Sequence, residues 1–225
     1  MIALKSKRME KVKVKVYIKR NIIPISIEIV FLISCFIIPS EFFIYTNFIF
    51  YLSLLFFFVI RKEFSMREWI GNMKQGRKFW KPVFITVVFF LFAFVITTVL
   101  ENMFPDFHTG SIGLKRDSWF ELVLFAISTI ALPPIVEELF YRKSMIFLDS
   151  KIYLIVTTIF SMFLYAAEHA LSAWGILLAM IWALPLSVSY IKTKNVFVPM
   201  TAHFIVNLVG NGADVIYTII ARLGM

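Results

Sequence analysis

The sequence has 225 residues, of which 60% are hydrophobic and 17% aromatic, and its formal net charge is +9. A water-soluble domain of this size needs much more polar surface to cover its core, so this composition excludes an ordinary soluble protein. Nucleic-acid binding is disfavoured as the reason for the charge, because the basic residues flank hydrophobic segments and no aromatic-basic groove motif accompanies them.

Seven hydrophobic stretches follow one another along the chain, each long enough to cross a bilayer as a helix, which takes roughly 20 residues, and the fourth and the last are longer than this. We expect an all-α fold, a polytopic transmembrane helix bundle of about seven spans (six to eight). Pro133 and Pro134 predict a kink or tilt in the fourth span. Gly210 and Gly212 could divide the seventh. The stretches are Ile22–Ile38, Phe42–Ile60, Pro82–Leu100, Trp119–Leu148, Ile152–Ala170, Trp174–Ile191 and Val196–Ile220.

The distribution of positive charge predicts the orientation. With the N-terminus inside, 20 of the 23 Lys and Arg residues fall on the cytoplasmic side, and only Lys115, Arg116 and Arg222 fall outside. This asymmetry follows the positive-inside rule. We therefore expect an integral protein of the cell membrane with a cytoplasmic N-terminus and with membrane lipids as partners.

Three regions follow from this arrangement. Residues 1–21 form a basic cytoplasmic arm, residues 22–118 contain the N-terminal transmembrane helices, and residues 119–225 contain the last four spans. The basic cytoplasmic loop 61–81 is either an amphipathic stretch on the inner leaflet or an ordinary loop with interfacial Trp anchors. The Lys11–Val16 alternation predicts either a short strand or a polybasic surface arm.

Polar side chains within the late spans form a pattern. Ionisable groups are costly inside a bilayer, so each needs a structural or chemical reason to be there. Residues four apart share one face of a helix, and the economical arrangement turns all such faces toward one cavity. The pairs with this spacing are Glu138 and Arg142 in an EExxxR motif that begins at Glu137, Tyr165 and His169, and His203 and Asn207 in an HxxxN motif.

These residue types suit amide hydrolysis by an activated water. A carboxylate and an imidazole together can hold a water and remove its proton, and a second imidazole and a carboxamide can donate to a developing oxyanion. No GxSxG or HExxH motif is present. We expect no cofactor, although a Glu/His/His set such as Glu137, His169 and His203 could also bind zinc.

With these motifs in this order, the chain resembles the CPBP family of CAAX proteases and bacteriocin-processing enzymes, from about Leu132 to Leu208. The resemblance also includes the basic-polar turn before Pro199. It implies a CPBP-like intramembrane protease core at residues 119–225, with a catalytic core from the last four spans. In this core, Glu137 would activate water with His169 as its partner. His203 and Asn207 would form the oxyanion site. Glu138 and Arg142 would brace the helices, with Tyr165 as a further supporting residue.

The chain departs from the usual family pattern at three places. The Phe-Arg-Gly that usually follows the paired glutamates is Tyr141-Arg142-Lys143, the usual Phe of the second motif is Tyr165, and Glu168 adds an acid beside the histidine. The proposed catalytic groups are kept, so we expect these changes to affect the substrate more than the activity. The charge of Lys143 has no explanation in the sequence.

The other polar residues near the spans receive structural roles. They are Glu28, for which the sequence suggests no partner, His108 in the outer loop, Glu168 and Asp214. A geometric tension also remains, because His169 would lie about 27 Å along its helix from Lys151 but His203 only about 12 Å from Asn195. For both to reach Glu137, the fifth span must tilt or begin beyond the inner surface.

The function predicted is therefore an intramembrane endopeptidase whose partner is a peptide or a lipidated protein substrate. Prenylated C-terminal motifs, peptide pheromones and bacteriocin leaders all remain open as substrates. The alternative is a non-catalytic membrane immunity factor or scaffold that keeps the fold. Proton-coupled transport would also use buried Glu and His, but no inverted repeat supports it.

Overall fold

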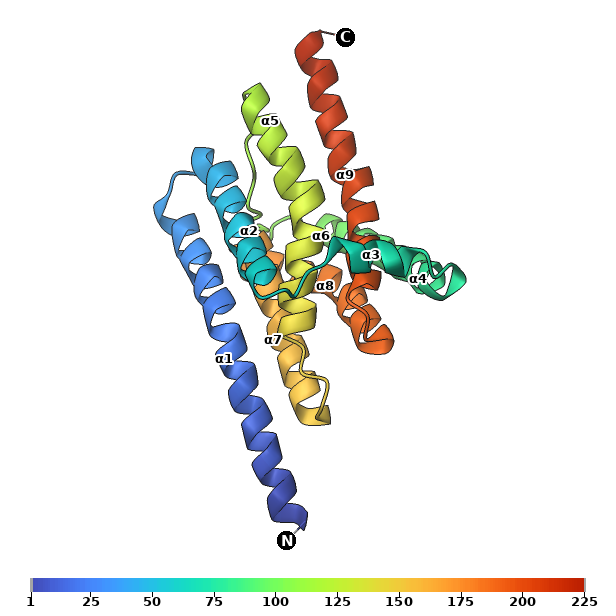
Figure 1. Cartoon of the computed structure of the whole chain (residues 1–225). Coiled ribbons are helices and arrows are strands. Elements are labelled where there is room, and N and C mark those ends of the chain that lie inside the picture. The colour runs from blue at the N-terminus through green and yellow to red at the C-terminus, as the bar shows by residue number, and fades with distance from the viewer. Residues whose placement is uncertain (1, 225) are drawn as a thin grey trace.

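A computed structural model describes the backbone of residues 2–224 and the side chains of residues 13–224. The described chain is a helix bundle (Figure 1). Seven of its helical segments are long and apolar enough to span a membrane, which confirms the all-α fold and the span count. The elements are α1 (Ile2–Ile37), η1 (Ser40–Phe42), α2 (Phe43–Ile60), α3 (Met66–Met73), α4 (Arg77–Met103), α5 (Trp119–Ala126), η2 (Ile127–Ala131), α6 (Leu132–Glu137), η3 (Glu138–Ser144), α7 (Lys151–His169), α8 (Ala173–Thr193) and α9 (Phe197–Leu223).

Helix α1 includes the alternating Lys11–Val16 segment, so the predicted strand is wrong. A helix satisfies its own backbone hydrogen bonds, whereas a lone strand at this position would leave them unpaired. The helix docks where the fourth span ends. The Tyr17 hydroxyl donates to the carbonyl of Met145 at 2.7 Å, and the Asn21 amide donates to the carbonyl of Ser144 at 3.1 Å.

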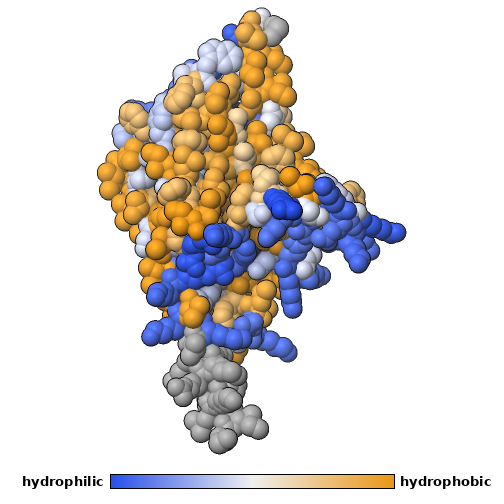
Figure 2. Space-filling view, viewed as in Figure 1, coloured by the Kyte–Doolittle hydropathy of each residue, from blue (hydrophilic) through white to orange (hydrophobic). Residues whose placement is uncertain are grey.

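The basic segment 61–81 contains the short helix α3. Ser65 caps its N-terminus by accepting from the Glu68 N–H. Trp69 is buried and donates to the Thr201 hydroxyl at 2.7 Å, so this tryptophan holds α3 against α9 and is not an interfacial anchor. Figure 2 shows hydrophilic side chains gathered around α3 and the start of α4, beside a broad hydrophobic surface.

The charge of Lys143 also finds its explanation in this segment. Its ammonium group donates to the Glu63 carbonyl at 2.6 Å, while the Glu63 carboxylate pairs with Arg20 and with Arg61. The end of η3 is thereby fixed to the turn after α2 and to α1.

The fourth span departs from α-helical geometry around Pro133 and Pro134. Both prolines are buried in α6, and π-helical segments lie on each side of it, at η2 and η3. Proline has no N–H, so the carbonyl of Thr129 finds no donor at the fourth or the fifth following residue. The predicted irregularity is present, and it leaves a carbonyl free at the centre of the bundle.

Helix α9 is continuous, so the predicted division at Gly210 and Gly212 is wrong. A break inside a bilayer would expose backbone polar groups without partners. A glycine within a helix costs only about 1 kcal/mol relative to alanine. The unbroken helix is therefore the less costly structure.

The turn between α7 and α8 lies against the loop that follows α4. The Ile112 N–H donates to the His169 carbonyl at 3.0 Å, and the Leu171 N–H donates to the Gly110 carbonyl at 2.9 Å. Figure 1 shows that α7 begins closer to the N-terminal end of the bundle than α9 does. This offset removes the geometric tension seen in the sequence, because α7 reaches the middle of the bundle only at its C-terminal end.

Gly175 is required at this turn, and Gly175→Ala is expected to destabilise the fold by about 1–3 kcal/mol. A Cβ at this position would lie 1.9 Å from the carbonyl oxygen of Thr109 and 2.6 Å from the Cβ of Ala170. Thermal unfolding in detergent measures the effect. Gly210→Ala is the control, since a Cβ there meets nothing within 4 Å. Equal unfolding temperatures for both variants would contradict the close approach.

Candidate active site

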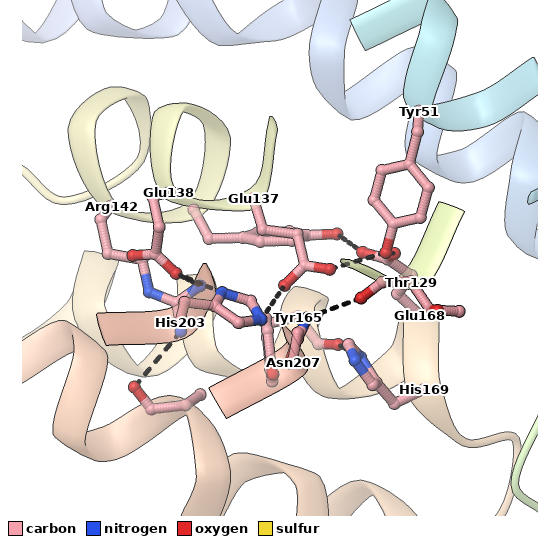
Figure 3. Close-up of polar contacts among 12 residues, drawn as sticks. Tyr51, Thr129, Glu137, Glu138, Arg142, Tyr165, Glu168, His169, His203 and Asn207 are labelled. Carbon is pink, nitrogen blue, oxygen red and sulfur yellow. Dashed lines mark hydrogen bonds and ion pairs between the residues drawn. The ribbon is translucent and has the colours of Figure 1, made fainter. Parts of the chain in front are cut away.

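A cavity of about 380 Å³ lies inside the bundle, and five of the sequence-predicted site residues line it. They come from three separate spans, and Figure 3 shows their arrangement. Glu138 and Arg142 do not line the cavity but lie directly behind it, fully buried. The lining residues from the predicted set are Glu137, Tyr165, His169, His203 and Asn207.

Glu137 ends α6 and is buried, with only 1% of its surface exposed. Its Oε1 accepts from the Tyr51 hydroxyl at 2.6 Å. Its Oε2 has no hydrogen-bond partner among the described residues and lies 4.0 Å from Nε2 of His203. One oxygen is thus held in place, and the other can accept from a water in the cavity.

His203 is oriented from behind by Glu138. The Nδ1 of His203 lies 3.0 Å from Oε1 of Glu138, and the same oxygen lies 3.3 Å from Nη1 of Arg142. Arg142 also stacks its guanidinium 4.6 Å from the ring centroid of Tyr165. Because a carboxylate only accepts hydrogen bonds, Nδ1 carries a proton, and Nε2 is the nitrogen that faces Glu137.

His169 is the last residue of α7, and its ring stacks on that of Tyr165 with centroids 4.4 Å apart. The Nδ1 of His169 lies 2.8 Å from the backbone carbonyl of Tyr165. A carbonyl accepts but cannot donate, so Nδ1 carries the proton and a neutral ring has its lone pair on Nε2. This is the tautomer that a proton acceptor in the cavity requires.

The side chain of Asn207 is held by the Thr129 carbonyl, which has no helical hydrogen-bond donor because of the two prolines. Its amide donates to the Thr129 carbonyl at 2.8 Å, and Asn211, one turn further along α9, donates to the same oxygen at 3.0 Å. The carboxamide of Asn207 has a second N–H, which is available to an oxygen atom in the cavity.

Sequence reasoning missed part of this cluster. The Tyr141 hydroxyl lies 2.7 Å from Oε2 of Glu28, which is a partner that the sequence did not indicate. Glu168, predicted only as a structural residue, lines the cavity and bonds to Tyr141 and to Tyr51. The sequence contained a signal for these contacts, because the spans hold more acidic residues than Arg142 alone can pair with. Each of the other buried acids needs a hydroxyl group or a bound proton as a partner.

The remaining acid lines the cavity, whereas the remaining histidine lies outside it. Asp214 is exposed at the far end of the cavity, 3.9 Å from a guanidinium nitrogen of Arg116. His108 lies in the loop after α4, where its Nδ1 accepts from the Gly110 N–H.

The side chains that could bind zinc do not form a metal-binding group in the described part of the chain. Across residues 13–224, no three His, Cys, Asp or Glu side chains are grouped so that they could hold a metal ion. Glu137, His169 and His203 share the cavity without forming such a group.

Residues 119–209 match the model of a protein family described as Type II CAAX prenyl endopeptidase Rce1-like. The Rce1-like family is part of the CPBP family, so this part of the chain matches the CPBP family. The Rce1-like family is a protease family, which supports a hydrolase in general. The matched region runs from the start of α5 into α9 and includes every residue of the predicted set, but not α1 or α2. No curated protein and no solved structure matches the chain.

Proposed function

We propose that this protein is an intramembrane endopeptidase that hydrolyses a peptide bond in a membrane-associated or lipidated peptide or protein. The observation that carries the proposal is the cavity itself. It combines an oriented carboxylate, a histidine whose Nε2 can accept a proton and two nitrogen donors, within the region that matches a protease family.

The reaction begins with a water bound between Oε2 of Glu137 and Nε2 of His169. Glu137 removes a proton as the water oxygen attacks the carbonyl carbon of the scissile bond. The resulting oxyanion accepts from the Nε2–H of His203 and from the free N–H of Asn207. Glu137 then returns the proton to the leaving amine.

The oxyanion role requires that both nitrogens of His203 carry protons. Two carboxylates flank the ring, since Oε1 of Glu138 lies 3.0 Å from Nδ1 and Oε2 of Glu137 lies 4.0 Å from Nε2. Arg142 fixes Glu138 from its other side. Glu138 and Arg142 therefore support His203 and do not need to touch the substrate.

A non-catalytic immunity factor or scaffold is the less favoured function. A scaffold needs only the packing of the helices. An unpaired carboxylate oxygen buried in a cavity destabilises the fold, and a scaffold would gain nothing from it. Glu137 keeps such an oxygen among the described residues. The peptidase explains why this cost is tolerated.

His169→Ala tests the proposed function. We expect the loss of the group that holds the attacking water together with Glu137 to reduce cleavage by about 10²- to 10⁴-fold. Mass spectrometry of membrane peptides from cells producing each variant identifies products that depend on His169. His108→Ala is the matched control, because His108 lies in a loop away from the cavity. An unchanged peptide profile in the His169 variant, at equal protein abundance, would rule out catalysis by this site.

A further inference from the structure

Three buried carboxyl groups and two buried tyrosine hydroxyls alternate through the centre of the bundle. The Tyr141 hydroxyl lies 2.7 Å from Oε2 of Glu28 and 2.6 Å from Oε2 of Glu168. The Tyr51 hydroxyl bonds to Oε1 of Glu168 and lies 2.6 Å from Oε1 of Glu137. We call the series Glu28, Tyr141, Glu168, Tyr51 and Glu137 the carboxyl–tyrosine chain. Figure 3 shows its last three members side by side.

The carboxyl–tyrosine chain joins elements that are far apart in the sequence. Its members come from α1, α2, α6, η3 and α7, and each has at most 4% of its surface exposed. Lysine and arginine do not compensate its charge. In the part of the protein with described side chains, neither residue type forms an ion pair with any of these three glutamates, and the basic side chain paired with the series is His203, whose Nε2 lies 4.0 Å from Oε2 of Glu137.

A count of protons shows how many charges the chain can carry. Four contacts between oxygen atoms join its five members, and each hydrogen bond needs one proton between the two oxygens. The two tyrosines supply two protons. The other two must come from carboxyl groups, so two of the three glutamates are protonated and one is ionised. Three ionised carboxylates would leave two contacts without a proton and would bury three like charges together.

We propose that the carboxyl–tyrosine chain holds two protons on its three carboxyl groups and shares a single negative charge, which its other members direct to Glu137 for catalysis. With the charge on Glu137, Glu28 donates to Tyr141, Tyr141 to Glu168, Glu168 to Tyr51, and Tyr51 to Glu137. If each of these four protons moves one oxygen along the chain, the charge passes to Glu28. No proton enters or leaves, and no covalent bond between heavy atoms changes.

The catalytic part of this inference rests on the proposed function. Glu137 must be ionised before the attack, and a buried site cannot draw freely on bulk water to set that state. The carboxyl–tyrosine chain sets the ionised state of Glu137, because Glu168 and Glu28 are protonated and Glu137 is then the member that carries the charge. Tyr51, Glu168, Tyr141 and Glu28 are positioning residues. Glu28 and Tyr51 also lie outside the region that matches the CPBP family.

Infrared spectroscopy of the full-length protein in lipid nanodiscs tests the chain without an activity assay. Exposed carboxyl groups are ionised at neutral pH, so a carbonyl band of protonated carboxylic acid reports buried, neutral glutamates. We expect a band of two acids in the wild type. Glu28→Gln and Glu168→Gln should each reduce it to one, because the amide replaces a protonated acid as donor. Glu101→Gln, an exposed position at the end of α4, should leave it unchanged.

The proposal for the carboxyl–tyrosine chain would be wrong if the wild type lacked the band, or if the band were unaltered in both Gln variants. A second measurement uses Tyr51→Phe, which removes the donor to Glu137. We expect kcat to fall about tenfold or more while KM stays within twofold, as for the loss of a hydrogen bond to a charged group. Tyr45→Phe on the same helix is the control, since Tyr45 bonds to Glu121 outside the chain. If the two-acid band is present but peptidase activity is absent, the proposed function is wrong while the proposal for the carboxyl–tyrosine chain stands. If cleavage occurs without the band, the proposal for the carboxyl–tyrosine chain is wrong while the proposed function stands.

Discussion

Glu137→Gln is expected to reduce peptide-bond cleavage by about 10²- to 10⁴-fold, the usual effect of removing a general base. Glutamine has nearly the shape of glutamate, and its carbonyl oxygen can still accept from Tyr51. What the variant loses is the ability to take a proton from water at the second oxygen. The fold should therefore be kept while the chemical step is lost. The measurement is kcat on a peptide identified by the comparison of membrane peptides.

Glu101→Gln provides the matched control for this substitution. It makes the same chemical change at an exposed position on α4 and should leave the rate unchanged. A Glu137→Gln protein that cleaves within threefold of the wild type would exclude the carboxylate as the base. If binding alone were affected, KM would rise while kcat stayed constant.

The polar faces of single helices could be predicted because they depend only on helical periodicity. Glu138 and Arg142, or Tyr165 and His169, lie four residues apart, and this spacing places each pair on one face. The requirement that buried polar groups avoid lipid then brings the faces to one cavity. The sequence therefore contains most of the candidate site.

Contacts between helices could not be predicted in the same way. The contribution of Tyr51 depends on how far α2 is rotated and where it lies along α6, which its hydrophobic sequence does not specify. Glu28 likewise reaches Tyr141 only because α1 packs beside the fourth span. These positions depend on how all the helices of the bundle pack together, and this packing cannot be derived from a single sequence.

The two prolines illustrate an intermediate case. Pro133 and Pro134 predict an irregular helix, and the residue that lacks a donor follows from counting back to Thr129. The partner of that carbonyl does not follow from the count. Only the structure shows that Asn207 and Asn211 both bind it, which connects a helix defect to the orientation of a predicted site residue.

His203→Ala is expected to lower kcat by about 10²- to 10³-fold with little change in KM, because an oxyanion donor acts mainly in the transition state. The structure offers a graded test of this role. His203→Gln keeps a side-chain N–H that can reach toward the cavity, so its rate should lie between those of the wild type and the alanine variant. A purely structural role predicts a different order, set by how well each side chain fills the space beside Phe90, whose ring centroid lies 5.7 Å from that of His203.

Thermal unfolding separates these two explanations. His203→Ala removes a partner of Glu138 but leaves its ion pair with Arg142, so part of the buried network stays satisfied. If the oxyanion role is correct, rates corrected for the folded fraction still follow the order wild type, glutamine, alanine. Rates that become equal after this correction would instead show that His203 only stabilises the bundle, and the oxyanion would then have to rely on Asn207 alone.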